Sequence, residues 1–281
     1  MDKVNRGMDV LLGVKQEWEL VSDGEISVIG NSLLQPVISA GRKAIVKVPL
    51  NKEGRSGFRL LECWNGHAAV NVYRYDARAL LMERATGNRS LTGMVLSGEE
   101  EAANRIVCAV VEQLHANPCP NVSDLVPLHE WFRSLETAAR REGGSFARGY
   151  AVATGLLEDA AMDTPDRLVA LHGDIHYGNI LDGGSRGWLA IDPKGAVGER
   201  GFDYANIFCN PDLTVAGSPE RLSSQVRLVA GLAGIPVQRM LRWIIAWAAL
   251  MAAWMLEDGV NPLLPLTVGE IAERELGDAR S

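Results

Sequence analysis

Apolar positions in the first third of the chain fall into short runs of the kind that form strands. Residues 26–41 (ISVIGNSLLQPVISAG) and 43–48 (KAIVKV) are rich in β-branched residues and are interrupted by Gly, Asn and Ser. A further apolar strand is predicted at 79–82 (ALLM), and 83–88 (ERATGN) has the composition of a turn. The pattern therefore predicts a small sheet near the N-terminus.

Beyond residue 90 the spacing of apolar residues becomes helical. Ser97 and Glu100 have the form of a capping box at the start of a helix. Residues 129–141 and 146–161 continue the helical pattern on either side of a Gly-Gly pair. The apolar positions that recur at helical spacing after the capping box are Ile106, Val107, Val110, Val111 and Leu114.

Together these patterns predict an α+β chain of two lobes, a small β-rich lobe over residues 1–85 and a larger, mainly helical lobe over 86–281. A chain of 281 residues that is 47% hydrophobic has enough apolar surface for both. Residues 243–256 (WIIAWAALMAAWML) contain no charge, but the run is shorter than the roughly 20 residues that cross a bilayer. We therefore expect a buried core helix there.

Composition narrows the choice of partners and compartment. The net charge is −7 and no stripe of Lys and Arg is present, so neither nucleic acid nor a membrane is expected as a partner. No charged-then-apolar secretion signal opens the chain. Cys63, Cys108, Cys119 and Cys209 lie far apart without a C-x-x-C pair, which argues against a disulfide framework or a zinc cluster and for a reducing compartment, the cytoplasm.

Candidate chemistry is concentrated in residues 171–181 (LHGDIHYGNIL) and 188–195 (WLAIDPKG). We predict that residues 168–175 (LVALHGDI) and 188–193 (WLAIDP) each contain a short buried strand and that these strands pair as a hairpin. Its ends would present Asp174, Asn179 and Asp192. In phosphoryl transfer an acid orients the attacking hydroxyl, while an amide oxygen and a second carboxylate hold the metal that bridges the nucleotide phosphates. Magnesium prefers such hard oxygen ligands.

A structural role is the competing interpretation for each of these residues. Asp and Asn at strand ends often form turns or caps, but the joint pattern H-G-D-x-x-x-x-N followed by I-D-P favours chemistry. His172 directly follows an apolar strand, so we expect it to support the loop. His176 either faces the substrate or fills the loop, and the sequence leaves both open.

The segments HGDIHYGNI and WLAIDPKGAVGERGFDYANIFCNPD closely resemble the aminoglycoside phosphotransferases, in the branch of streptomycin 6-phosphotransferases grouped with hydroxyurea phosphotransferases. The resemblance runs from about KAIVKV to RWIIAWAALMAAW. It implies a protein-kinase-like two-lobe fold with nucleotide bound by the first lobe, and with the catalytic loop and substrate pocket in the second. It also implies ATP and Mg²⁺ as cofactors and an aminoglycoside as substrate, with transfer to the 6-hydroxyl of streptomycin and antibiotic resistance as the result. Oligomeric state stays open.

Carried over residue by residue, the resemblance implies that Asp174 is the catalytic base and that Asn179 and Asp192 bind the metal. Lys47 matches the strand lysine that reaches the nucleotide phosphates. In the family an acid on the following helix pairs with this lysine. Glu53 is the nearest candidate, but its register is imperfect and Glu62 is an alternative.

The resemblance also assigns residues around the nucleotide. Ser32, in the loop IGNSLLQ, is a candidate for covering the phosphates, against an ordinary turn serine. The segment 80–85 (LLMERA) matches the link between the lobes, where the backbone meets the adenine edge at Glu83, Arg84 and Ala85. Asp203 matches an acid that braces the catalytic loop, with a helix N-cap as the other interpretation.

A streptomycin-like substrate carries guanidinium groups, which bind carboxylates and flat aromatic faces. We favour Glu199, since it follows Asp192 by seven positions. Tryptophans within the apolar run 243–256 are more often core residues than pocket residues. The candidates for substrate binding are Glu199, Asp212, Trp243, Trp247, Trp254, Glu257 and Asp258.

Two other functions remain open from the sequence. One is a kinase for another small hydroxyl compound, either hydroxyurea or a metabolite. The other is a nucleotide-binding pseudokinase that serves as an interaction module. The joint presence of Lys47, Asp174, Asn179 and Asp192 argues against the pseudokinase, because a non-catalytic protein has no chemical need for all four.

Overall fold

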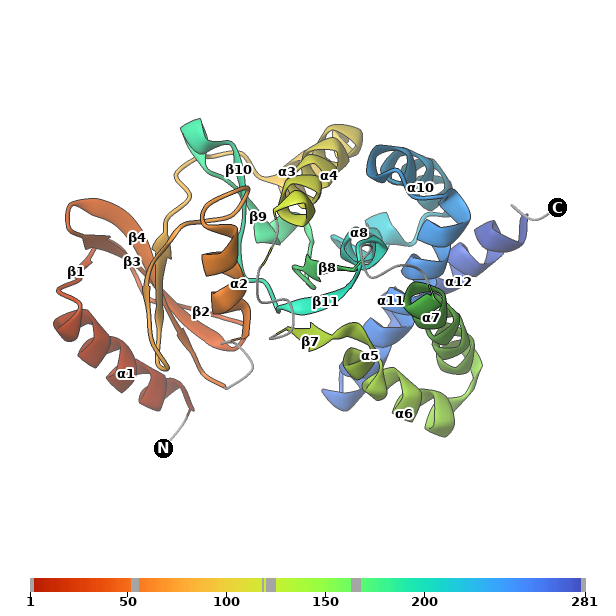
Figure 1. Cartoon of the computed structure of the whole chain (residues 1–281), viewed down its shortest axis with the longest axis horizontal. Coiled ribbons are helices and arrows are strands. Elements are labelled where there is room, and N and C mark those ends of the chain that lie inside the picture. The colour runs from red at the N-terminus through yellow and green to blue at the C-terminus, as the bar shows by residue number, and fades with distance from the viewer. Residues whose placement is uncertain (1–2, 52–55, 118, 120–124, 163–167, 279–281) are drawn as a thin grey trace.

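The computed structural model describes residues 3–51, 56–117, 119, 125–162 and 168–278. Figure 1 shows a lobe built on a sheet at the N-terminal end of the chain and a larger helical lobe beside it. The predicted two-lobe α+β fold is confirmed.

The small lobe is a six-stranded antiparallel sheet in the order β1-β3-β4-β6-β5, with β2 paired to β3. The predicted runs at 26–41, 43–48 and 79–82 all contribute strands to it. Its central pair, β3 and β4, is in register from Ser32 opposite Pro49 to Ser39 opposite Arg42. The strands are β1 (Val21–Ser22), β2 (Ser27–Ile29), β3 (Ser32–Ser39), β4 (Arg42–Pro49), β5 (Val72–Tyr75) and β6 (Leu80–Glu83).

Two helices that the strand pattern does not reveal cover the sheet, α1 (Lys3–Glu17) and α2 (Ser56–Trp64). Side chains alternate between the faces of a strand, so Leu81 of β6 packs in the core that contains α1. Leu80 and Met82 belong to the other core, which α2 shares with the large lobe. In Figure 1, α2 accordingly lies on the side of the sheet that faces the large lobe.

The large lobe is built around α11, whose residues 243–250 are all buried and which packs against α7 and α12. Among the described residues it is the one helix long and apolar enough to cross a membrane, and 67% of its apolar window is buried, as expected for a core helix. The helices of this lobe are α3 (Leu91–Leu96), α4 (Glu100–Ala116), α5 (Leu128–Trp131), α6 (Arg133–Glu142), α7 (Gly144–Met162), α8 (Gly201–Ala205), α9 (Leu213–Ala216), α10 (Pro219–Ala233), α11 (Val237–Glu257) and α12 (Leu263–Asp278).

The predicted capping box at Ser97 is wrong. Ser97 is the C-terminal cap of α3, and its Oγ donates to the carbonyl oxygen of Met94 at 3.0 Å. The next helix, α4, starts at Glu100 with Glu99 at its N-cap. The chain turns between two helices here, so the serine serves the helix before it.

The predicted hairpin between LVALHGDI (168–175) and WLAIDP (188–193) is also wrong. β8 (Leu168–Leu171) pairs with β11 (Ala196–Glu199), which also pairs with β7 (Val126–Pro127). β10 (Trp188–Ala190) pairs instead with β9 (Ile180–Asp182). A short 3₁₀ turn at Tyr177–Asn179 precedes β9, and a Gly-rich turn joins β9 to β10, so β10 pairs with the strand nearest to it in the chain.

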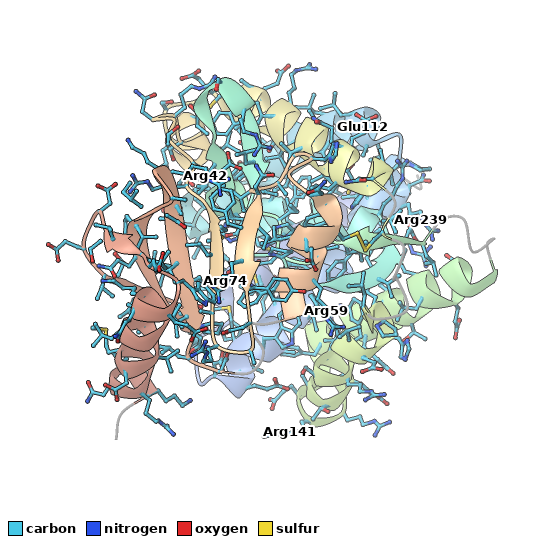
Figure 2. The ribbon with its side chains drawn as sticks, turned by 60° about the vertical axis from the view of Figure 1, so that its left-hand side comes forward. Arg42, Arg59, Arg74, Glu112, Arg141 and Arg239 are labelled. Atoms are coloured by element: carbon cyan, nitrogen blue, oxygen red, sulfur yellow. A yellow bond between two sulfur atoms is a disulfide. The ribbon has the colours of Figure 1, made fainter. Side chains whose placement is uncertain are left out.

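One disulfide departs from the expectation that the cysteines are unpaired. Cys63 near the end of α2 is bonded to Cys119 beyond α4, and the yellow bond in Figure 2 marks it beside α2. The ends of the two helices meet, since Asn117 Nδ2 donates to the carbonyl oxygen of Trp64 at 3.1 Å. Cysteines 56 positions apart give no spacing signal for such a pair. The other two cysteines are free and buried.

Candidate active site

A cleft of about 860 Å³ lies between the two lobes. Its lining comes from β3, β4 and β6 of the small lobe and from the two segments that the sequence singles out in the large lobe. The polar side chains that line it are Asn31, Ser32, Lys47, Asn51, Glu83, Arg84, Asp174, His176, Asn179, Asp192 and Lys194.

Lys47 reaches across the cleft from the middle of β4. In the sheet it lies between Leu34 of β3 and Leu80 of β6, which fixes its position in β4. Its side chain is only 7% exposed. Its Nζ forms an ion pair with Asp192 Oδ1. The strand lysine and the acid after the second apolar run therefore meet directly, although 145 positions separate them.

Neither predicted acid partner of Lys47 is seen beside it. Glu53 lies outside the described residues. Glu62 accepts a hydrogen bond from Tyr75 O–H at 2.8 Å on the exposed side of α2. In this structure the partner of Lys47 is Asp192.

Asp174 and Asn179 lie together in the loop after β8. Asn179 Nδ2 donates to the carbonyl oxygen of Asp174 at 2.9 Å and to its Oδ2 at 3.3 Å. Because the amide nitrogen is used in the loop, Asn179 Oδ1 is the atom that remains for a metal.

Lys194 was not predicted, and it links the two acids. Its Nζ lies 3.2 Å from Asp174 Oδ2 and 3.1 Å from Asp192 Oδ2. Burial opposes the charged form, but the two carboxylates hold the pKa of Lys194 above its ordinary value. Burial likewise works to raise the pKa of Asp192, yet the charges of Lys47 and Lys194 hold it below its usual range. The position of Lys194 directly after Asp192-Pro193 was the available signal.

The donor set fits magnesium. Among the described residues no group of three or more His, Cys, Asp or Glu side chains forms a metal cluster. One carboxylate and one amide oxygen, from Asp192 and Asn179, match an ion that keeps several waters and takes its other ligands from phosphates.

Asp203 holds the loop after β8 from within the large lobe. Its carboxylate accepts from the backbone N–H groups of His172 at 2.9 Å and Gly173 at 2.7 Å, and it lies 2.9 Å from Nε2 of His115. Asp203 lies in the first turn of α8, whose N-cap is Arg200. The N-cap interpretation is therefore not needed.

The two histidines of the loop hold its shape. His172 is fully buried, stacks on Trp64, and its Nε2 lies 2.8 Å from the carbonyl oxygen of Ile191. Its Nδ1 accepts from the N–H of Asp174 at 3.2 Å. His176 caps the 3₁₀ turn by accepting from the N–H of Gly178 at 3.1 Å, and it also lines the cleft. Burial lowers the pKa of both rings, which keeps them neutral.

The link between the lobes lines the same cleft. The Glu83 carboxylate accepts from Asn71 Nδ2 at 2.8 Å and pairs with Arg186. Arg84 pairs with Asp23 at 2.5 Å. Because both side chains are engaged elsewhere, the backbone is what this segment offers to a ligand. Ser32 also lies on the cleft, at the start of β3.

The predicted substrate residues do not form one group, and none is part of the cleft lining. Glu199 is bound by Arg239, through Nε at 2.7 Å and Nη2 at 2.5 Å, and by the indole N–H of Trp243 at 3.0 Å. Trp247 is buried and donates to Asn206 Oδ1 at 3.1 Å. The physical reason is that both tryptophans lie on buried faces of α11.

The remaining predicted substrate residues lie near the ends of helices. Asp212 caps α9 by accepting from the N–H of Val215 at 3.1 Å. Trp254 packs against Trp131 with ring centroids 5.7 Å apart. Glu257 and Asp258 are exposed at the end of α11.

Solved structures share this architecture. A thermostable mutant of aminoglycoside phosphotransferase APH(4)-Ia, in a ternary complex with ADP and hygromycin B, superposes with a TM-score of 0.65 at 16% identity, over 96% of this chain and 98% of that one. An ethanolamine kinase of Plasmodium vivax gives a TM-score of 0.64 at 15% identity, over 89% of this chain and 83% of that one. The fold is that of the kinase-like small-molecule phosphotransferases.

Sequence comparison identifies the family. The aminoglycoside/hydroxyurea antibiotic resistance kinases match residues 17–259, and the chain belongs to this family. A streptomycin 3''-kinase of Klebsiella pneumoniae is 43% identical over 93% of this chain and 99% of its own length. A streptomycin 6-kinase of Streptomyces glaucescens is 28% identical over 89% and 83%. A hydroxyurea phosphotransferase of Kitasatospora aureofaciens is 29% identical over 94% and 77%.

Proposed function

We propose that this chain transfers the γ-phosphoryl group of ATP to a hydroxyl of streptomycin. The observation that carries the proposal is the meeting of Lys47, Asp174, Asn179 and Asp192 in one cleft between the lobes. A relative 43% identical over nearly its whole length is named a streptomycin kinase, which supports the substrate.

Each residue then has a chemical role. Lys47 binds oxygens of the nucleotide phosphates. Asp192 and Asn179 Oδ1 would hold a magnesium ion, which when bound would neutralise charge on those phosphates. Asp174 accepts the proton of the substrate hydroxyl as its oxygen bonds to the γ-phosphorus. The bond from that phosphorus to the bridging oxygen breaks, and ADP leaves with the electron pair.

Lys194 contributes a second cation to this reaction. It lies within 3.2 Å of both Asp174 and Asp192, so it sits where the γ-phosphoryl group must pass between base and metal. A fixed cation at this place stabilises the negative charge on the equatorial oxygens during transfer.

We take the 6-hydroxyl of streptomycin as the acceptor, because the segment from WLAIDP to NPD resembles the 6-phosphotransferase branch. The 3''-hydroxyl is the second candidate, since the relative at 43% identity is named a 3''-kinase. A phosphate on either hydroxyl adds negative charge to a cation whose target is RNA, which weakens recognition and gives resistance. ATP supply places the reaction in the cytoplasm, where the Cys63–Cys119 pair would be reduced.

The test measures ADP release from ATP and Mg²⁺ in the presence of streptomycin, kanamycin or hydroxyurea. We expect turnover with streptomycin and none with kanamycin, and phosphorus–proton correlation spectra of the product assign the acceptor hydroxyl. Turnover with hydroxyurea alone would instead indicate a hydroxyurea phosphotransferase, the activity for which the Kitasatospora aureofaciens relative is named. ATP binding without turnover on any of them would favour a binding module.

A further inference from the structure

A chain of hydrogen bonds connects the core helix of the large lobe to Asp174. The indole N–H of Trp247, on α11, donates to Asn206 Oδ1 at 3.1 Å. Asn206 Nδ2 in turn donates to Asp174 Oδ1 at 3.1 Å. Asn206 and Trp247 are 5% and 3% exposed, so water does not compete for these bonds.

The chemistry of the three groups fixes the orientation of the amide. An indole N–H can only donate and a carboxylate oxygen can only accept. Asn206 must therefore turn Oδ1 to Trp247 and Nδ2 to Asp174. A second donor agrees with this, because Asn210 Nδ2 also lies 3.1 Å from Asn206 Oδ1.

The Asp174 carboxylate needs such a restraint. The torsion that turns an Asp carboxyl group is broad and roughly two-fold, so the side chain does not fix it by itself. Asn206 binds Oδ1, whereas Oδ2 lies beside Lys194 and Asn179, which line the cleft. The carboxylate is thus held with one defined oxygen toward the reacting groups.

We propose that Asn206 is a positioning residue for the catalytic base, and that Trp247 acts through it by fixing its amide. The proposal rests on the proposed function, in which Asp174 accepts the proton of the substrate hydroxyl. Proton transfer and attack depend on reacting atoms being placed to well within 1 Å, so a carboxylate that is free to turn loses rate while binding is unaffected. Neither Asn206 nor Trp247 lies against the cleft.

The competing explanation is that the two residues only tie α11 to the loop. Trp243 provides a matched control on the same helix, one turn earlier. It is fully buried, its indole N–H donates to Glu199 at 3.0 Å, and its ring packs edge-on to Phe202 as that of Trp247 does. Trp→Phe at either position removes one indole hydrogen bond, to the Glu199 carboxylate from Trp243 and to the Asn206 amide from Trp247. Only Trp247 leads to Asp174.

The experiment compares Asn206→Leu, Trp247→Phe and Trp243→Phe by steady-state kinetics, ADP affinity and thermal melts. We expect Asn206→Leu to lower kcat by about 10- to 100-fold and Trp247→Phe by roughly 3- to 10-fold, with KM for ATP and streptomycin within about twofold of wild type. Trp243→Phe lowers the melting temperature to a similar extent as Trp247→Phe, with kcat within about twofold. ADP affinity stays unchanged throughout.

The double variants separate positioning from tethering. If Trp247 acts through Asn206, Asn206→Leu with Trp247→Phe turns over no more slowly than Asn206→Leu alone, whereas effects of independent residues multiply. Multiplied effects, or a kcat of Asn206→Leu within about twofold of wild type, would overturn the proposal. If Asn206→Leu does not fold, the comparison of kcat between Trp247→Phe and Trp243→Phe decides. Equal kcat values for these two variants would overturn the proposal. A wild-type protein without turnover on any substrate would instead refute the proposed function on which this inference rests.

Discussion

Asp203 offers the sharpest test of how the catalytic loop is held. Its carboxylate is 1% exposed and accepts from the N–H groups of His172 and Gly173, with His115 Nε2 as a third neighbour. Asp203→Asn keeps the shape of the side chain, but one acceptor oxygen becomes an NH₂ group. Whichever way the amide turns, its NH₂ faces at least one donor.

The cost follows from those contacts. Losing one hydrogen bond to a charged acceptor costs about 1.5–3 kcal/mol, and leaving a buried donor unsatisfied adds about 1–3 kcal/mol. We therefore expect the free energy of unfolding to fall by about 2.5–6 kcal/mol, a large part of the roughly 5–15 kcal/mol typical of a native protein. Turnover falls as well, since both loop N–H groups lie next to Asp174 in the chain.

The assay is urea unfolding of Asp203→Asn beside Asp212→Asn. Asp212 receives the same chemical change at an N-cap, where Asn and Asp are about equally good, so its unfolding free energy should stay within about 0.5 kcal/mol of wild type. A loss of less than about 1 kcal/mol at Asp203 would refute the reasoning, because even one neutral hydrogen bond is worth that much.

Three further predictions follow from the site. Lys47→Met should lower kcat by about 10²-fold or more, because it removes a fixed cation from the phosphates, while circular dichroism shows an unchanged fold; kcat within tenfold of wild type would contradict its role. Burial lowers the pKa of His172 in the folded state, so below about pH 6.5 the unfolded chain takes up a proton that the folded chain does not. The unfolding free energy, measured in urea from pH 8 to pH 5, should thus be highest above that pH and decrease below it. The decrease should be less steep in His172→Asn. Gly57→Ala would place a Cβ 1.7 Å from the carbonyl oxygen of Pro193, so both melting temperature and kcat should fall, whereas Gly13→Ala, with no atom within 4 Å, should be neutral or slightly stabilising.

Sequence reasoning alone could place together only those site residues that are close to one another in the chain. Asp174, Asn179 and Asp192 fall within two segments that a single two-stranded hairpin, β9–β10, connects. A segment that short can arrange its ends in few ways. Polar residues that follow its apolar runs can therefore be predicted to lie close together in space. Lys47 joined them only through the resemblance to a family, because nothing local relates a strand lysine to a loop 145 positions later.

The substrate residues could not be predicted because long-range pairs determine whether a side chain is available. Glu199 is near the catalytic segments in the chain, but Arg239, 40 positions later, occupies its carboxylate. Trp247 has the composition of an aromatic binding face, yet its ring is buried and its N–H serves Asn206. Spacing along one element cannot show which neighbouring element will cover it.

The predicted pairing of β8 with β10 was wrong, yet Asp174 and Asp192 line the same cleft. β8 and β10 belong to different sheets, so strand pairing does not bring Asp174 to Asp192. The loops after the strands do this: the N–H of Lys194 donates to the carbonyl oxygen of His172 at 2.7 Å, and Nε2 of His172 lies 2.8 Å from the carbonyl oxygen of Ile191. His172 therefore joins the two segments through its backbone carbonyl and its buried ring, and these two contacts help to hold Asp174 and Asp192 toward one cleft.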